Sequence, residues 1–182
     1  MLPALLLFAS PQIGHTHLTD FFMPEYDEPA AIALGSQAAP DSLAVAANPE
    51  ESHIVNVRQM TFGGQNAEAY WNRDGKKITY QTRQPGYPDE QVFTMNADGS
   101  KKTLMSTGKG RCTCSYFTPD NKWIYFSSTH DKNEGAQKPL DMSKGYFWMV
   151  NPEFSLFRRL ANGQGEIQKI LDLGGYVAET TI

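Results

Sequence analysis

Two carboxylates and a thiol occupy equivalent positions of an internal repeat. Glu68 and Cys114 are 46 residues apart, and Glu68 and Glu179 are 111 residues apart, which are the two offsets at which the chain resembles itself. Carboxylates and thiolates bind metal cations, and a carboxylate pair also accepts the amine of a basic peptide end. If their common face lines a central channel, we expect a site for a cation or a basic peptide end. The alternative is a set of solvated polar groups that pair with nearby Lys or Arg side chains, because exposed carboxylates are common.

Further candidates lie in and beside one long connection. His130 follows the strand-like run "WIYFSS" and begins an insertion over residues 131–144, and the aromatic run "GYFWMV" comes directly after it. Loops positioned by a rigid scaffold carry much of the binding function of proteins, although an isolated histidine is more often structural than a ligand. The residues predicted to bind are therefore Glu68, Cys114, His130, Tyr146, Trp148 and Glu179.

The chain contains no recognisable catalytic motif. The G-x-S-x-G elbow, the Walker loop and the H-E-x-x-H helix are all missing from the sequence, so we predict no catalytic residue and no cofactor. Cys112 and Cys114, two positions apart on an expected strand, should face the same side and are too far apart for a good disulfide. The sequence thus favours a non-enzymatic protein. A metal site in the channel, built on Glu68, Cys114, His130 and Glu179, remains the catalytic alternative.

The repeat identifies the elements that must position these residues. The segment "AYWNRDGKKITYQT" (69–82) matches "SYFTPDNKWIYFSS" (115–128) at an offset of 46, and "LGGYVAET" (173–180) matches "FGGQNAEA" (62–69). The unit is 46 residues long at first and 65 residues long where it contains the insertion at 131–144. Periods of roughly 40 to 50 residues with several short strands are typical of propeller blades.

Each unit is expected to form four strands, and in the first they fall near 67–71, 77–82, 91–96 and 102–106. The run "KKITYQT" alternates between two faces, as a half-buried strand does, and Asp-Gly pairs at 74–75 and 98–99 suit tight hairpin turns. A four-stranded unit cannot bury both faces alone, so neighbouring units should stack. The predicted fold is all-β: an incomplete β-propeller of about two four-stranded antiparallel blades and the start of a third, with a disordered N-terminal leader.

The N-terminal third differs from the repeat. Residues 1–19 contain the apolar run "LPALLLFAS", which resembles part of a secretory signal, residues 20–52 read as a flexible leader, and residues 53–182 hold the blades. The apolar run is too short for a stable membrane span. We therefore expect a periplasmic or secreted protein, or a cytoplasmic one if the run is not a signal. The net charge of −4, with no dense basic stripe, argues against a nucleic-acid partner.

From His53 to Thr82 the sequence resembles TolB-like, WD40-like β-propeller proteins of bacterial envelopes. The resemblance rests on Met60-Thr61, on Ala69-Tyr70-Trp71 and on the turn "NRDGK" (72–76), and it recurs at Tyr116-Phe117 and "TPDNK" (118–122). Asn72-Arg73 replaces the usual Ser-Pro, and Asn121 replaces Gly, which a turn can absorb. The resemblance, which covers about residues 53–182, implies a scaffold that engages a protein or peptide through blade-end loops.

Three alternatives stay open. Propellers of this kind also cap serine peptidases of the prolyl-oligopeptidase type and form some hydrolases and lyases, so the chain could be a fragment of such an enzyme. Two units and a partial third fall short of the roughly four to eight blades of a closed ring, so we expect a truncated product or self-association that completes the ring. A fragment without an independent function is the third alternative.

Overall fold

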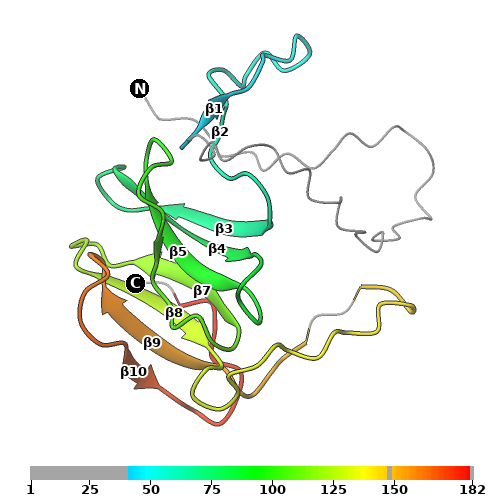
Figure 1. The fold of residues 1–182 in the computed structure, drawn as a ribbon, viewed down its shortest axis with the longest axis vertical. Helices are drawn as coiled ribbons and strands as arrows, with labels where there is room; N and C mark the ends of the chain where they lie inside the picture. Colours follow the sequence, from blue (N-terminus) through cyan, green and yellow to red (C-terminus); the bar gives the residue numbers. More distant parts are fainter. Residues whose placement is uncertain (1–40, 147–148, 181–182) are drawn as a thin grey trace.

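The computed structural model describes residues 41–146 and 149–180, and in these ranges the regular structure is entirely β. Its strands form one two-stranded and two four-stranded sheets, all antiparallel (Figure 1). The predicted all-β class and its four-stranded antiparallel units are confirmed. The strands are β1 Leu43–Ala44, β2 Arg58–Gln59, β3 Gln65–Trp71, β4 Lys77–Arg83, β5 Gln91–Asn96, β6 Thr103–Leu104, β7 Cys112–Phe117, β8 Trp123–Ser128, β9 Ser155–Leu160 and β10 Gln168–Leu171.

The first four-stranded sheet, in the order β3-β4-β5-β6, is a simple meander whose turns follow from the sequence. Between β3 and β4, Gly75 adopts φ 68° in a tight turn, and the Asn72 side chain accepts hydrogen bonds from the backbone N–H groups of Lys76 and Lys77. Between β5 and β6, Gly99 adopts φ 88°. Glycine reaches these left-handed conformations without a steric penalty, which is why Asp-Gly pairs mark both turns.

The second sheet, in the order β10-β9-β8-β7, has the same meander topology. Its β7 and β8 repeat β3 and β4, with Asn121 at φ 59° where the first sheet has Gly75. The predicted insertion lies in the connection from β8 to β9, and Figure 1 shows its described part reaching away from the sheets as a long yellow loop. The second unit is longer than the first because of this connection.

The two sheets pack face to face around one apolar cluster, and a second buried cluster, made of Ile78, Tyr80, Phe93 and Met95, belongs to the first sheet. Val92 and Met105 of the first sheet join a buried cluster with side chains of the second, among which Ile124 and Phe126 are fully buried. The hydroxyls of Thr79 and Ser115 share a hydrogen bond of 2.7 Å across the interface. Burial of these faces against each other supplies the stabilisation that neither four-stranded sheet could obtain alone.

The segment before the first blade-like sheet contributes a small pairing of its own. Strand β1, Leu43–Ala44, lies in the predicted leader (20–52) and pairs with β2, Arg58–Gln59, which follows the leader. The predicted signal-like segment and the rest of the leader up to residue 40 lie outside the described residues. No helix that could cross a bilayer occurs between residues 41 and 180, apart from the two undescribed positions 147 and 148.

Candidate functional site

The first strand of each four-stranded sheet, β3 or β7, lies at an edge of its sheet and carries a β-bulge at the equivalent residue. The register of β3 against β4 shifts between Ala67 and Tyr70, and that of β7 against β8 shifts between Thr113 and Tyr116. The non-glycine residues inside these bulges adopt left-handed backbone, with φ 48° at Glu68 and 53° at Cys114. A bulge redirects the side chain that it contains, because the extra residue leaves the regular alternation of the strand.

The repeat brings three of the predicted residues together. The third equivalent residue, Glu179, has φ 58° although it lies outside any strand, and the ligand atoms of Glu68, Cys114 and Glu179 all lie within 4.8 Å of one another. The Cys114 thiol donates a hydrogen bond of 3.2 Å to Oε1 of Glu179. We call these three residues the channel cluster. Their binding role, which the sequence predicts, stays a prediction.

A buried amide holds the second bulge in place. Oε1 of Gln81, on β4, accepts hydrogen bonds from the backbone N–H of Cys114 at 2.8 Å and from the Thr113 hydroxyl at 2.7 Å. All three residues are buried. Because a buried donor or acceptor is costly to leave unpaired, this network fixes the strand conformation that presents the thiol.

Burial and neighbouring charges raise the pKa values of two members of the channel cluster, Glu68 and Cys114. Burial, followed by the charge of Glu179, raises the pKa of the Glu68 carboxyl, while a hydrogen bond with Cys114 and, more weakly, the charge of Arg111 oppose this shift. Burial raises the pKa of the Cys114 thiol to about 12. The protein alone therefore holds Cys114 as a neutral thiol at neutral pH.

The expectation that both cysteines face the same side is wrong. Cys112 packs in the core between the sheets, where its sulfur shares a 3.1 Å hydrogen bond with the Ser128 hydroxyl, and burial raises its pKa to about 11. Cys114 instead contacts Glu179. The bulge between Thr113 and Tyr116 breaks the two-residue alternation on which the expectation rested. The structure contains both residues as free thiols.

His130 is not part of the channel cluster. Its ring shares a 2.7 Å hydrogen bond with the Ser128 hydroxyl through Nδ1 and lies over Phe157, with ring centroids 4.3 Å apart. Burial lowers its pKa, against the opposing effect of Asp131. These contacts pack His130 two residues beyond the end of β8, and its predicted binding role stays a prediction. Trp148, also predicted to bind, lies outside the described residues.

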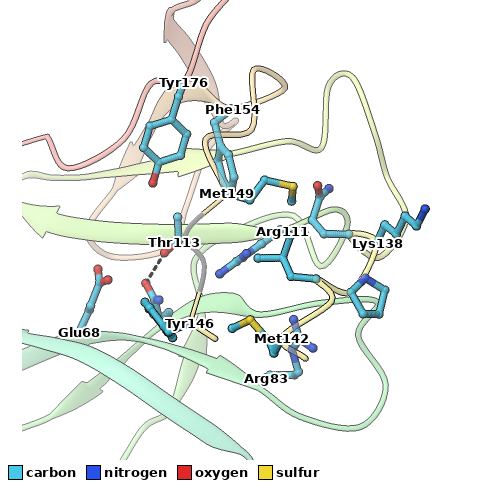
Figure 2. Close-up of a pocket in the computed structure, with 14 residues that line it drawn as sticks. Glu68, Arg83, Arg111, Thr113, Lys138, Met142, Tyr146, Met149, Phe154 and Tyr176 are labelled. Atoms are coloured by element: carbon cyan, nitrogen blue, oxygen red, sulfur yellow. Dashed lines mark hydrogen bonds between the residues drawn. The ribbon is translucent and has the colours of Figure 1, made fainter. Parts of the chain in front are cut away.

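A cavity of about 320 Å³ opens between the insertion and the ends of the two sheets (Figure 2). The first sheet contributes Glu68, Gln81 and Arg83 to the wall. The second contributes Thr113 of β7 and Arg111, which comes directly before β7. Figure 2 shows Glu68 at one end of this cavity and Lys138 at the other. The insertion and the C-terminal segments supply the remaining wall, namely Gln137, Lys138, Pro139, Leu140, Met142, Tyr146, Met149, Phe154 and Tyr176.

Two ion pairs shape the floor of this cavity. Arg83 pairs with Asp89, whose carboxylate is almost fully buried, and Nε of Arg111 lies 2.6 Å from the Glu90 carboxylate. Asp89 also accepts a hydrogen bond of 3.0 Å from the backbone N–H of Gln137. One buried carboxylate in the β4–β5 connection thus ties the middle of the insertion to the first sheet and orients an arginine.

The sequence predicts only part of this cavity. Glu68 and Tyr146 are predicted residues that line it, whereas the two arginines and the anchor Asp89 are not among the predicted residues. The signal for Arg111 was its place directly after Gly110, at the loop that begins the second unit. No sequence signal pairs Asp89 with Gln137, because 48 residues separate them.

Comparisons with known proteins give limited similarity. No family model matches the chain. An uncharacterized protein of Agrobacterium fabrum is 34% identical over 61 residues, which cover 32% of this chain and 20% of that protein. A solved structure from Agrobacterium tumefaciens, provisionally assigned as TolB, has 18% identity and a TM-score of 0.49, and the similarity covers 66% of this chain and 39% of that one. The chain spans about a fifth of the curated relative and about two fifths of the solved structure.

Proposed function

We propose that this protein is a non-enzymatic binding module that holds a peptide, or an extended segment of a protein, in the cavity beneath the insertion. The observation that carries the proposal is the composition of the cavity wall, which combines both blade-like sheets with the insertion. The insertion is a long loop in the second unit, and it forms part of the wall of a cavity that both units line. Loops on a rigid scaffold and cavities of this kind are common sites of ligand recognition.

The chemistry of the wall suits an extended peptide. Apolar side chains, including Leu140, Met142 and Phe154, can cover the side chains of a ligand, while each arginine engages its acidic partner through one nitrogen. A guanidinium carries five N–H donors, so Arg83 and Arg111 can also donate hydrogen bonds to ligand carbonyl groups. A volume near 320 Å³ is at the small end of the range for ligand pockets, so the cavity fits a few residues of a peptide rather than a folded domain.

The resemblance of residues 53–182 to TolB-like propellers supports this class of function. Such propellers serve as scaffolds that present loops at one end of the blades. The proposal accordingly includes a propeller-type architecture, a location in the bacterial envelope or outside the cell, and completion of the ring by association with further blades. The alternative, a fragment of a propeller-containing hydrolase, peptidase or lyase, predicts turnover of the bound ligand instead of stable binding.

Panning of a phage library of random peptides on the immobilised full chain tests the proposal. The enriched peptide, labelled with a fluorophore, is then titrated with three variants: Leu140→Ser and Tyr146→Ala in the cavity wall, and Val150→Ser as the control. Val150 is 66% exposed, lies in the same connection and does not line the cavity. Each of the three positions is at least 39% exposed, so the substitutions should leave the fold intact.

The expected result is weaker binding by both cavity variants and unchanged binding by Val150→Ser. A contact with a well-buried side chain is worth about 1 kcal/mol or more, so each loss should be roughly fivefold or greater. Equal affinities for the protein and both cavity variants would overturn the proposal. Cleavage of the enriched peptide during the titration would favour the enzymatic alternative.

A further inference from the structure

The channel cluster has the composition of a metal site. It brings two carboxylates and one thiol within 4.8 Å, each on a repeat-equivalent residue, and Cys114 as a whole is only 6% exposed. Cys114 and Glu179 already share a hydrogen bond of 3.2 Å. The three groups therefore converge without any large movement of the backbone.

One carboxylate oxygen of the channel cluster is buried without a hydrogen-bond partner among the described residues. This atom is Oε2 of Glu68. A buried carboxylate oxygen without a partner costs free energy, and a bound cation would remove that cost. This orphaned oxygen is an observation separate from the spacing of the three side chains.

The nearby cationic side chain does not meet this demand. Arg111 lies close enough to influence the Glu68 carboxyl, but its guanidinium is engaged at 2.6 Å with the Glu90 carboxylate. The 2.6 Å contact of Arg111 is thus with Glu90, and its effect on Glu68 is the weakest of those named. A bound cation would add positive charge beside the Glu68 carboxyl.

We propose that Glu68, Cys114 and Glu179 bind a divalent cation of the zinc class. Thiolate ligands select zinc-like ions, whereas calcium takes about six to eight oxygen ligands and magnesium prefers a near-octahedral oxygen shell. Zinc binds sulfur at about 2.3 Å and carboxylate oxygen at roughly 2.0–2.2 Å, so ligand atoms spaced within 4.8 Å need only small side-chain rotations to close on it.

Binding must displace the thiol proton. The S–H bond of Cys114 breaks, the sulfur forms a bond to the ion, and the proton leaves to solvent, so affinity rises with pH. Three protein ligands leave a fourth position of a tetrahedral ion open. Because Glu68 also lines the cavity beneath the insertion, we expect that open position to be accessible from this cavity, where water would fill it.

Titration of the metal-free full chain with Cd²⁺ tests the inference. Cadmium reports on thiolate ligation through its sulfur-to-metal charge-transfer absorption, and calorimetry with Zn²⁺ gives the affinity and stoichiometry. The variants are Cys114→Ser, Glu68→Gln and Glu179→Gln. Cys112→Ser is the matched control, because it removes the other thiol, which lies in the core away from the cluster. A thermal melt checks that each variant remains folded.

The expected outcome is one Cd²⁺ per chain with a charge-transfer band in the protein and in Cys112→Ser. Cys114→Ser should lose the band, and each glutamine variant should bind Zn²⁺ at least about tenfold more weakly, since even second-shell changes have effects of that size. Should Cys114→Ser fail to fold, the two glutamine variants decide.

Three results would overturn the inference. The first is a band that survives in Cys114→Ser, which would assign the ion to other ligands such as the histidines at 15, 17 and 53. The second is an affinity that both glutamine variants leave unchanged. The third is Ca²⁺ binding that exceeds Zn²⁺ binding and ignores the loss of the thiol. None of these results bears on peptide binding beneath the insertion, so the two proposals can fail separately.

Discussion

Glu68 and Cys114 occupy equivalent bulges of β3 and β7, with left-handed backbone at φ 48° and 53°, and both side chains belong to the same cluster. The backbone conformation therefore repeats more closely than the residue type, because a glutamate and a cysteine adopt nearly the same φ. Glu179 extends the pattern with φ 58° beyond the last strand. The three residues of the channel cluster thus share a left-handed backbone conformation, although they are not the same residue type.

Substitution of the repeat-equivalent glycines Gly64 and Gly110 should be more destabilising than substitution of Gly75. All three have positive φ, but an added Cβ would lie 2.6 Å from the Arg83 carbonyl oxygen at Gly64 and 2.6 Å from the Asn133 carbonyl oxygen at Gly110. Gly75 has no such neighbour within 4 Å. We predict a loss of about 1 kcal/mol for Gly75→Ala, from backbone conformation alone, and larger losses for the other two. Urea unfolding measures the difference, and equal losses at the three sites would contradict it.

Protonation of His130 should destabilise the fold. Burial lowers its pKa below the usual 6.5, so between the folded and the unfolded pKa values the unfolded chain binds more protons. Stability must then fall as the pH drops below about 6.5. Asp131 and Glu134 oppose this shift, while Lys169 and Lys109 add to it.

Comparing His130→Gln with the unmutated protein isolates the contribution of His130 protonation to the pH dependence of stability. The variant should lose less stability between about pH 7.5 and 5.5, measured by urea midpoints, and the exposed His53→Gln is its control. A pH dependence that His130→Gln leaves unchanged would contradict the assignment.

Asp89→Asn should loosen the insertion. The buried carboxylate pairs with Arg83 and accepts the backbone N–H groups of Gln137 and Glu90, so its neutralisation weakens three charge-assisted hydrogen bonds, at a cost of about 1.5–3 kcal/mol. Hydrogen exchange in residues 137–146 should accelerate as well. Glu134→Gln is the control, since its pair with Lys109 is exposed and should contribute less than about 1 kcal/mol. Equal effects of the two substitutions would argue against the anchoring role of Asp89.

Both cysteines should react slowly with thiol reagents in the folded, metal-free protein. Burial raises the pKa of Cys112 to about 11 and that of Cys114 to about 12, and the thiolate is the reactive form. We expect labelling by a chromogenic disulfide reagent at pH 7 to be slower than in urea by roughly 100-fold or more, because each pKa unit changes the thiolate fraction about tenfold. Rapid labelling of the folded chain would contradict the burial of both thiols.

The sequence predicted the strands where local chemistry is sufficient. The alternation in "KKITYQT" predicted β4, and the two Asp-Gly pairs predicted the β3–β4 and β5–β6 turns. The offset of 46 predicted the second sheet. The bulges were not predictable in this way. A glutamate or a cysteine with positive φ carries no local signal, so the altered direction of Cys114 relative to Cys112 followed only from the structure.

The cavity was predictable only in part for a related reason. Long connections indicate recognition, which led to Tyr146, but the floor depends on contacts between residues distant in sequence. Gln81 reaches Cys114 across 33 residues, and Gln137 reaches Asp89 across 48. Such pairs arise when two sheets and an insertion pack together, and no periodicity of the chain specifies them.

Hydrogen exchange of the full chain with and without the enriched peptide tests the central claim most directly. The account predicts that the bound peptide slows exchange in residues 137–146 of the insertion and around Arg111 to Thr113, which together line the cavity. Protection confined to β10, whose residues are all exposed and lie outside the cavity, would contradict it.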